Sequence, residues 1–194
     1  MSKVVIIDYG AGNMMSVKFA LQRLGLNPLV SRNFEEINSA EKVIFPGVGE
    51  AKSAMDTLYA YGLDKVITEL QQPVLGVCLG MQLLCESSEE RETKGLGVIP
   101  LRVERIREGV KVPHMGWNQI RDLKGPLFKN IRENDYMYYV HGYRVPDSQY
   151  TIGKTDYGCE FSAAVMKNNF YGCQFHPEKS GPSGQIILQN FLEI

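Results

Sequence analysis

The sequence predicts an α/β fold in which helices cover both faces of a mostly parallel sheet. In the first half of the chain, short apolar runs alternate with stretches whose apolar residues recur at helical spacing. The short runs are apolar at consecutive positions, which is typical of strands buried on both faces. Alternation of such strands with helices implies parallel neighbours. Because 194 residues suit one domain, we expect a single domain over residues 1–194.

The first half of the chain contains four predicted strands. They cover residues 4–7, 29–30, 43–45 and 73–77. Helices are predicted after the first, third and fourth strands, the last of them over residues 81–86. Asn13 or Ser16 is a candidate N-cap of the first helix, and Gly25 is placed to end it. Gly62 marks a candidate break in the second helix, because glycine disfavours helix interiors.

The second half of the chain has a different pattern, with short segments between turn residues that predict antiparallel strands. These segments cover residues 99–106, 117–120, 136–143, 150–155, 163–167 and 170–175. Residues 167–170 contain two asparagines and predict a hairpin turn, and residues 184–194 predict a closing helix. Together the elements predict a flavodoxin-like three-layer α/β/α sandwich, with a mostly parallel central sheet and added antiparallel strands in the C-terminal half.

Composition argues against several classes of protein. The chain has 21 basic and 22 acidic residues, so no basic excess favours a nucleic-acid partner. No apolar run approaches the roughly 20 residues that cross a bilayer, and Asp8 follows the first apolar run too soon for a secretory signal. We therefore expect a cytoplasmic protein with reduced thiols. The cysteines and histidines lack metal-ligand spacing, so no metal and no cofactor are expected.

The strongest local signal is Gly76-Val77-Cys78-Leu79-Gly80, where a predicted strand runs into a helix. A sharp turn at this point would lift the cysteine side chain out of the sheet, as in a nucleophile elbow. The flanking glycines relieve crowding, and the positive end of the following helix favours the thiolate, which is the nucleophilic form. The amide of Leu79 is then placed to donate to a developing oxyanion. The motif predicts a catalytic cysteine, Cys78.

The second signal is His176-Pro177-Glu178 near the C-terminus. Proline disfavours helical geometry at the preceding residue, so we expect an extended segment in which His176 and Glu178 point the same way. The carboxylate would then orient the imidazole and stabilise the imidazolium, which is the logic of a catalytic triad. The sequence therefore predicts Cys78, His176 and Glu178 as catalytic residues.

The remaining cysteines and histidines fit catalysis less well. Cys85 is expected inside the helix after the elbow as a small core residue. Cys159 and Cys173 lie in strand-like stretches without a nearby base. His114 and His141 have no acidic residue beside them in the sequence, so His176 is the preferred general base.

The motif from Gly76 to Gln82, together with the His176 motif, resembles the class I glutamine amidotransferases over essentially the whole chain. The resemblance implies that Cys78 attacks the side-chain amide of L-glutamine and that His176 carries the proton to departing ammonia. A glutamyl thioester forms and is hydrolysed to L-glutamate. It also implies a glutamine pocket. The implied lining residues are Gly47, Gln82, His141, Gly142 and Tyr143. Many relatives carry a small hydroxyl residue in place of Gly142, so a contact there must come from the backbone.

Four stretches narrow the resemblance to the glutaminase subunits of imidazole glycerol phosphate synthase, an enzyme of histidine biosynthesis. They are Asp8-Tyr9-Gly10-Ala11-Gly12-Asn13, Pro46-Gly47-Val48-Gly49, Pro113-His114-Met115-Gly116-Trp117-Asn118 and His176-Pro177-Glu178-Lys179-Ser180. This resemblance implies that the partner is a cyclase subunit, which uses the ammonia, in a heterodimer. The expected interface comprises Asn13, Met115, Trp117 and Lys179. Trp117 suits the protein core and the interface equally well.

The loop with Val48 and Gly49 is expected to supply the second oxyanion donor, in addition to the amide of Leu79. Rotating the peptide plane between Val48 and Gly49 requires a positive φ that glycine tolerates. Our hypothesis is that partner binding selects the state in which this amide points into the oxyanion hole. A plain tight turn is the alternative explanation.

Three other functions stay open from the sequence. The first is another class I glutaminase, serving guanylate, anthranilate or pyridoxal phosphate synthesis. The second is a non-enzymatic flavodoxin-like binding module, since Gly10 and Gly12 follow the first strand, although the third glycine of a dinucleotide loop is missing. The third is a cysteine protease, which the order of the triad residues and the elbow disfavour.

Overall fold

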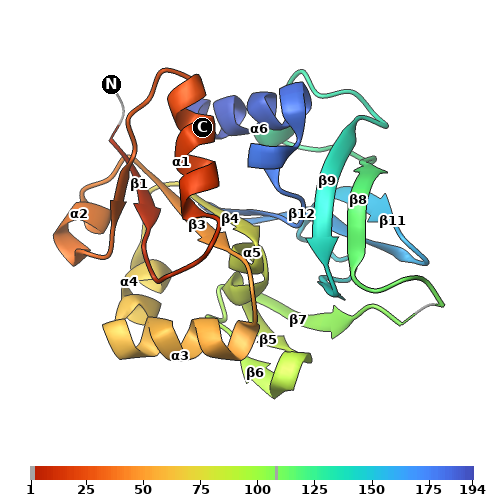
Figure 1. Ribbon diagram of the computed structural model, residues 1–194, viewed down its shortest axis with the longest axis horizontal. Coiled ribbons are helices and arrows are strands. Elements are labelled where there is room, and N and C mark those ends of the chain that lie inside the picture. The colour runs from red at the N-terminus through yellow and green to blue at the C-terminus, as the bar shows by residue number, and fades with distance from the viewer. Residues whose placement is uncertain (1–2, 108) are drawn as a thin grey trace.

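A seven-stranded sheet runs through the centre of the protein (Figure 1). The structure is a computed structural model that describes residues 3–107 and 109–194. The strand order is β11-β12-β13-β4-β3-β1-β2. The last five strands are mutually parallel, and β12 runs antiparallel to both of its neighbours, β11 and β13. The strands are β1 (Val4–Ile7), β2 (Leu29–Ser31), β3 (Lys42–Gly47), β4 (Val74–Cys78), β11 (Thr151–Asp156), β12 (Glu160–Lys167) and β13 (Phe170–Cys173).

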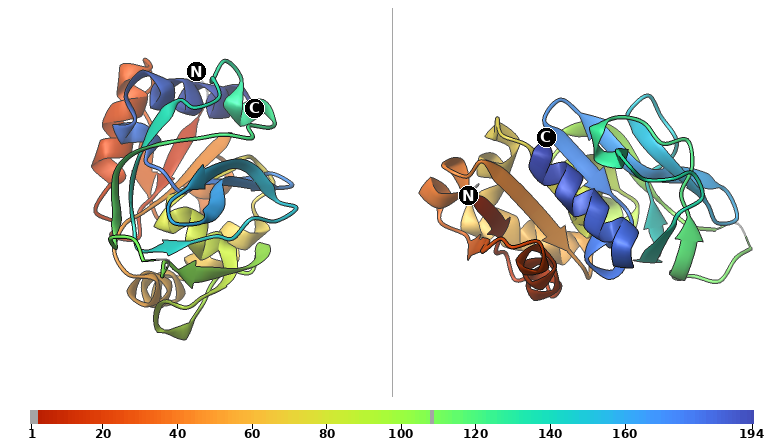
Figure 2. Two further views of the ribbon diagram at one scale, coloured as in Figure 1. Left: turned by 90° about the vertical axis from the view of Figure 1, so that its right-hand side faces the viewer. Right: turned by 90° about the horizontal axis from the view of Figure 1, so that it is seen from above.

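Helices cover both faces of this sheet (Figure 2). The side chains of β1 alternate between the two layers, since Val5 and Ile7 belong to one apolar cluster and Val4 and Ile6 to the other. Helices α1 (Met14–Arg23) and α6 (Gly181–Glu193) pack on one face. The other face is covered by α2 (Phe34–Asn38), α3 (Ala51–Tyr61), α4 (Leu63–Glu69) and α5 (Leu79–Leu84). The predicted three-layer α/β/α arrangement with a mostly parallel sheet is confirmed.

Two smaller sheets flank the carboxyl ends of the central strands. One has the order β10-β7-β5-β6 and the other pairs β8 with β9. Their strands are β5 (Cys85–Ser88), β6 (Thr93–Lys94), β7 (Ile99–Arg105), β8 (His114–Gln119), β9 (Tyr136–His141) and β10 (Tyr143–Arg144). Three short 3-10 helices complete the chain, η1 (Glu90–Glu92), η2 (Pro126–Phe128) and η3 (Pro177–Lys179).

Several predicted elements differ from the structure in their limits. Helix α5 begins directly after the elbow and ends two residues before the predicted limit, so Cys85 opens β5 instead of lying inside the helix. The short helix α2 was not predicted, although Asn33 caps it by accepting hydrogen bonds from two backbone amides. The second half is not uniformly antiparallel, because β13 pairs parallel with β4 and β5 pairs parallel with β7. The break at Gly62, which adopts a left-handed φ of 68°, is confirmed.

Candidate active site

Cys78 lies at the elbow between β4 and α5, with φ 53° and ψ −108°. A non-glycine residue in this region of backbone space is strained, and such strain concentrates at functional sites. The elbow packs closely against β3, since a Cβ on Gly80 would lie 1.9 Å from the Phe45 carbonyl oxygen. A Cβ on Gly76 would lie 2.8 Å from the Met81 amide nitrogen. Glycine on both sides of Cys78 is therefore a packing requirement, as predicted.

The ring of His176 meets the carboxylate of Glu178, with 2.8 Å between Nδ1 and Oε1. Both side chains are fully buried. His176 itself has the expected extended backbone, but the chain turns into the 3-10 helix η3 at Pro177. The predicted extended segment is therefore wrong beyond His176, because the tight turn, and not strand alternation, brings the carboxylate back to the imidazole. The hydroxyl of Ser180 closes this turn by donating to the His176 carbonyl oxygen.

His176 and Cys78 interact directly despite their separation in the sequence. Burial alone would lower the pKa of His176, but the interactions with Cys78 and Glu178 outweigh it and raise that pKa to about 10. Since Glu178 occupies Nδ1, Nε2 is the ring atom left for the sulfur, and Nε2 has no conventional hydrogen-bond partner among the described residues. The pair is therefore set up to hold a thiolate beside an imidazolium.

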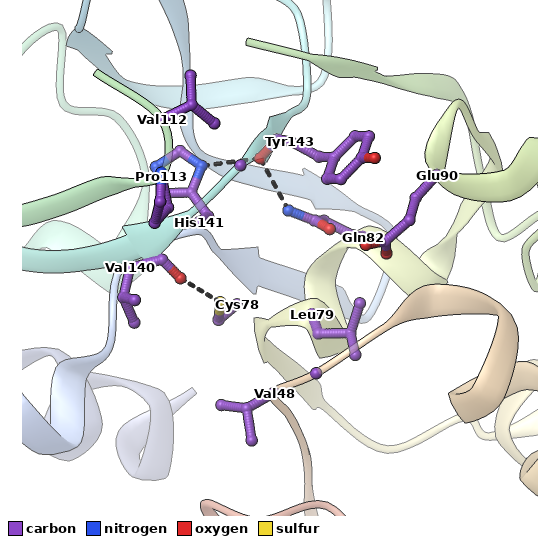
Figure 3. Close-up of a pocket in the computed structure, with 12 residues that line it drawn as sticks. Val48, Cys78, Leu79, Gln82, Glu90, Val112, Pro113, Val140, His141 and Tyr143 are labelled. Atoms are coloured by element: carbon purple, nitrogen blue, oxygen red, sulfur yellow. Dashed lines mark hydrogen bonds between the residues drawn. The ribbon is translucent and has the colours of Figure 1, made fainter.

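A pocket of about 390 Å³ opens at Cys78 (Figure 3). It brings together residues from the elbow, the β3–α3 loop, and the end of β9 with the residues that follow it. The lining residues are Val48, Gly49, Cys78, Leu79, Gln82, Glu90, Val112, Pro113, Val140, His141, Gly142 and Tyr143. His176 and Glu178 lie behind the cysteine and do not line this pocket.

Of the predicted glutamine-pocket residues, Gln82, His141, Gly142 and Tyr143 line this pocket and Gly47 does not. Its Cβ position lies 2.6 Å from the Gly80 nitrogen and 2.7 Å from the Tyr9 hydroxyl. Gly47 therefore packs directly against the elbow and the start of α5, and it does not line the pocket. Gly142 does line it, and a Cβ there would make only an ordinary contact of 3.4 Å with Val112.

Glu90 was missed by the sequence analysis and contributes a carboxylate to the pocket. Its Oε2 accepts a hydrogen bond of 2.7 Å from the backbone amide of Ala51, at the start of α3. Burial raises the pKa of Glu90, and the Ala51 hydrogen bond works against that rise. The sequence shows only a charged stretch of four glutamates between residues 86 and 92, which is typical of a solvated surface.

Val48, in the loop that continues to Gly49, lies beside Leu79 at one edge of the pocket (Figure 3). Gly49 has φ 104°, a value that favours glycine over residues with a side chain. Leu79 is the first residue of α5, so its amide is one of the helix groups without an intrahelical acceptor. The backbone freedom that the oxyanion hypothesis requires is therefore available at Gly49.

The four predicted interface residues divide into two groups. Met115 and Trp117 are 64% and 54% exposed, and Lys179 is also exposed. Trp117 is therefore not a core residue. Asn13 is only 4% exposed, and its side chain neither caps α1 nor reaches the surface. It donates to Glu178 instead, so Asn13 does not share the exposed position of the other three predicted interface residues.

Two other thiols, Cys85 and Cys173, are poor nucleophile candidates. Cys85 is completely buried, and burial raises its pKa to about 12. Burial also raises the pKa of Cys173. Among residues 3–107 and 109–194, no group of three metal-binding side chains could hold a metal ion. No helix in these two ranges is long and apolar enough to cross a membrane.

The family model of glutamine amidotransferase class-I matches residues 5–194. The chain therefore belongs to the class I glutamine amidotransferases, and it is an enzyme of that class. Solved structures support the same fold. A putative GMP synthase protein from Thermoplasma acidophilum has a TM-score of 0.77 at 19% identity, covering 100% of this chain and 93% of that one. PurLQS from Thermotoga maritima has a TM-score of 0.75 at 19% identity, covering 100% and 99%.

Within the class, the most similar relatives belong to one subfamily. The imidazole glycerol phosphate synthase subunit HisH of Bacteroides fragilis (strain YCH46) is 51% identical over 99% of this chain and 100% of the relative. The corresponding protein of Colwellia psychrerythraea is 48% identical over 100% of this chain and 93% of the relative. The chain belongs to this HisH family, as its motifs predicted.

Proposed function

We propose that this chain hydrolyses L-glutamine to L-glutamate and ammonia through a thioester on Cys78, as the glutaminase subunit of imidazole glycerol phosphate synthase. The observation that carries the proposal is the arrangement of Cys78 at the pocket with the His176–Glu178 pair directly behind it. Membership of the HisH family supports the choice of substrate and pathway. It also disfavours the glutaminases of other pathways.

The first half-reaction forms the thioester. The Cys78 proton resides on His176, and the sulfur attacks the side-chain amide carbon of glutamine. The carbon–nitrogen bond then breaks as His176 delivers the proton to the leaving nitrogen, which departs as ammonia. Glu178 holds the imidazole in the orientation needed for both transfers, since it accepts the Nδ1 hydrogen.

The second half-reaction releases glutamate. A water molecule gives a proton to His176 as its oxygen attacks the thioester carbon, and the carbon–sulfur bond breaks to restore Cys78. Each step passes through an oxyanion. We assign its stabilisation to the Leu79 amide and to the amide of the Val48–Gly49 loop. One such donor is typically worth about 10²–10³ in rate.

The pocket supplies groups for the other end of glutamine. Glu90 is the carboxylate among the lining residues, so we assign it to the α-ammonium group, where a charge-assisted hydrogen bond is strongest. Gln82, His141, Gly142 and Tyr143 complete the pocket and exclude water from the reacting amide.

The ammonia passes to a separate cyclase subunit, which makes imidazole glycerol phosphate and aminoimidazole carboxamide ribotide. Because ammonium forms readily in water, the two subunits need a sealed contact. We place this contact at the exposed Met115, Trp117 and Lys179. The protein works as one domain and as a heterodimer in the cytoplasm, where Cys78 stays reduced.

Glutamate production with and without the cyclase tests this function. The wild-type chain should release glutamate, and the cyclase should stimulate the release, whereas Cys78→Ala should be inactive in both conditions. Cys85→Ala is the matched control, since this buried thiol plays no part in the mechanism. Glutamine hydrolysis that survives Cys78→Ala would refute the proposal.

A further inference from the structure

A line of hydrogen-bonded polar groups runs from β8 to the sulfur of Cys78. It does not include His176 or Glu178. It begins at Asn118, whose Nδ2 donates to the Asp156 carbonyl oxygen over 2.8 Å and lies 3.3 Å from Nε2 of His114. The Asn118 oxygen accepts from the Gln119 amide. These contacts fix which end of the Asn118 side chain is the donor, so Nε2 of His114 must be an acceptor.

The two buried histidines continue the line in one direction. Because Nε2 of His114 accepts, its Nδ1 carries the hydrogen and donates to Nε2 of His141 over 3.0 Å. His141 must then carry its own hydrogen on Nδ1, which donates to the Tyr143 carbonyl oxygen over 2.7 Å. Burial lowers the pKa of His114 to about 4 and that of His141 to about 3. Both rings are therefore neutral at physiological pH, each in a single tautomer.

Two glutamine side chains carry the line on to Cys78. The Tyr143 carbonyl oxygen also accepts from Nε2 of Gln82 over 2.9 Å, and the same nitrogen donates to Oε1 of Gln174 over 2.9 Å. With its oxygen so engaged, Gln174 directs Nε2 at the sulfur of Cys78, at 3.6 Å. The direction of every donor from Asn118 to the sulfur is therefore determined.

Gln174 is an unusual residue for its position. It is completely buried between Cys173 and Phe175, which are both core residues. Burying a polar amide is costly unless its hydrogen bonds are satisfied, and an apolar residue would fill the same space without that cost. A fully connected polar line that ends on the reacting sulfur indicates a role beyond packing.

We propose that Gln174 is a second polar partner of the Cys78 thiolate, and that Asn118, His114, His141 and Gln82 are positioning residues that hold it. This inference rests on the proposed function, because it assumes that Cys78 is the nucleophile. The Gln174 N–H stabilises negative charge on the sulfur, in addition to the His176 imidazolium. The histidine pair keeps the Tyr143 carbonyl oxygen in place, and this oxygen in turn fixes the orientation of Gln82.

The first test replaces Gln174 by methionine, which has a similar length and no N–H donor. Hydrogen bonds to charged groups are worth enough to predict an approximately ten- to hundredfold loss in kcat/KM. The loss should fall mainly on kcat, because Gln174 does not line the pocket. Alkylation of Cys78 by iodoacetamide should be slower, with its pH midpoint moved to higher pH. Cys78→Ala gives the background from other thiols.

The double variant Gln82→Met, Gln174→Met controls for destabilisation of the single variant. In Gln174→Met the buried Gln82 amide loses a hydrogen-bond partner, whereas removal of both amides leaves neither of them unpaired. The double variant should remain folded and show the same slow alkylation. An alkylation profile identical to that of the wild type, in either variant, would overturn the role of Gln174.

The second test replaces the hydrogen-bond donor at the Asn118 end of the line by an acceptor. Asn118→Asp supplies only an acceptor, so His114 must carry a hydrogen on Nε2 and the ring tautomers must change. Nitrogen-15 NMR of the histidine rings should show Nδ1–H tautomers for His114 and His141 in the wild type and a different pattern in Asn118→Asp, with about tenfold lower kcat. Gln119→Glu, on the same strand and exposed, makes the same chemical change outside the line and should leave both readouts unaltered.

The outcomes separate this inference from the proposed function. Nε2–H tautomers in the wild type, or equal kinetics for Asn118→Asp and Gln119→Glu, would refute the positioning role. If Cys78→Ala is inactive while Gln174→Met behaves as the wild type, only the present inference fails. Activity that persists in Cys78→Ala defeats both.

Discussion

Asn13 donates a hydrogen bond to the carboxylate of Glu178, with 3.2 Å between Nδ2 and Oε1. The same carboxylate oxygen accepts from Nδ1 of His176. The loop after β1 therefore contacts the triad directly and fixes its carboxylate from a second side. Because Asn13 and Glu178 are both buried, water does not readily replace this contact.

Asn13→Asp should strongly impair catalysis. It places a second carboxylate against Glu178 in a buried site, where two like charges disfavour each other and one group takes up a proton. A Glu178 that is protonated or displaced no longer stabilises the His176 imidazolium, so we expect kcat to fall by about ten- to hundredfold. Steady-state glutaminase kinetics measure the effect. Asn33→Asp is the control, because Asn33 acts only as an acceptor at the start of α2. Unchanged kcat in Asn13→Asp would show that the contact is dispensable.

Glu90→Gln should raise KM for glutamine by about tenfold or more, with a smaller effect on kcat. Glutamine at this position keeps an oxygen that can accept from Ala51, so the local fold is retained while the charge opposite the α-ammonium group is lost. Hydrogen bonds to charged groups are typically worth about 1.5–3 kcal/mol. Glu86→Gln, at an exposed position nearby, should keep the wild-type KM. Equal KM values in the two variants would remove Glu90 from the substrate site.

Gly80→Ala should destabilise the protein through the elbow. The added Cβ would overlap the Phe45 carbonyl oxygen, and overpacking of this kind typically costs about 1–3 kcal/mol. Urea unfolding measures the free-energy change. Gly142→Ala is the matched control, since its Cβ has room beside Val112 and no unusual φ. A free energy of unfolding equal to that of the wild type would mean that β3 and α5 can separate without cost.

The triad was predictable because each half of it is a local motif. Gly76 to Gly80 specify a strand, a strained turn and a helix within five residues. His176 and Glu178 are two positions apart, so their contact requires only a turn. The same local logic predicted the parallel sheet, because consecutive apolar positions such as those of β1 depend on burial of both faces.

Other features of the site depend on contacts between distant segments. Asn13 has the sequence features of a helix cap, and only the approach of η3 to the start of α1 directs its side chain to Glu178. Glu90 lies next to a tight turn at Arg91 and Glu92, both of which have positive φ. No glycine marks this turn in the sequence, so the position of Glu90 at the pocket was not predictable. His114 and His141 are separated by 27 positions, and their partnership exists only through the pairing of β8 with β9.

The same two histidines predict acid sensitivity of the fold. The pKa of each lies below the ordinary value of about 6.5, at about 4 and about 3, so between about pH 6.5 and pH 4 the unfolded chain binds more protons than the folded one. The free energy of unfolding should therefore fall as pH falls, by up to about 1.4 kcal/mol per pH unit for each histidine. His176 has the opposite sign, since its pKa is raised, and its contribution is lost only as pH rises above about 6.5.

Urea unfolding between about pH 6.5 and pH 5 measures this dependence before most carboxylates titrate. His114→Phe keeps a ring stacked between Tyr139 and Tyr157 and removes one titrating group, so its slope against pH should be smaller. A wild-type stability that is constant over this interval would contradict the buried, neutral state of the pair.

Trp117→Ala should weaken binding of the cyclase without weakening the free glutaminase. The indole is 54% exposed and contacts the ring of Tyr138 edge-on, so its truncation removes little buried surface from the isolated chain, and exposed substitutions usually change stability by less than about 0.5 kcal/mol. Exposed tryptophans are frequent anchors of interfaces, where truncation commonly costs about 2 kcal/mol or more. The dissociation constant measured by calorimetry should therefore rise by at least about tenfold, and stimulation of glutaminase activity should require more cyclase.

Tyr59→Ala removes a similarly exposed ring (48%) from α3, on the other face of the sheet, and should leave the affinity unchanged. Equal affinities of the two variants for the cyclase would place the interface elsewhere.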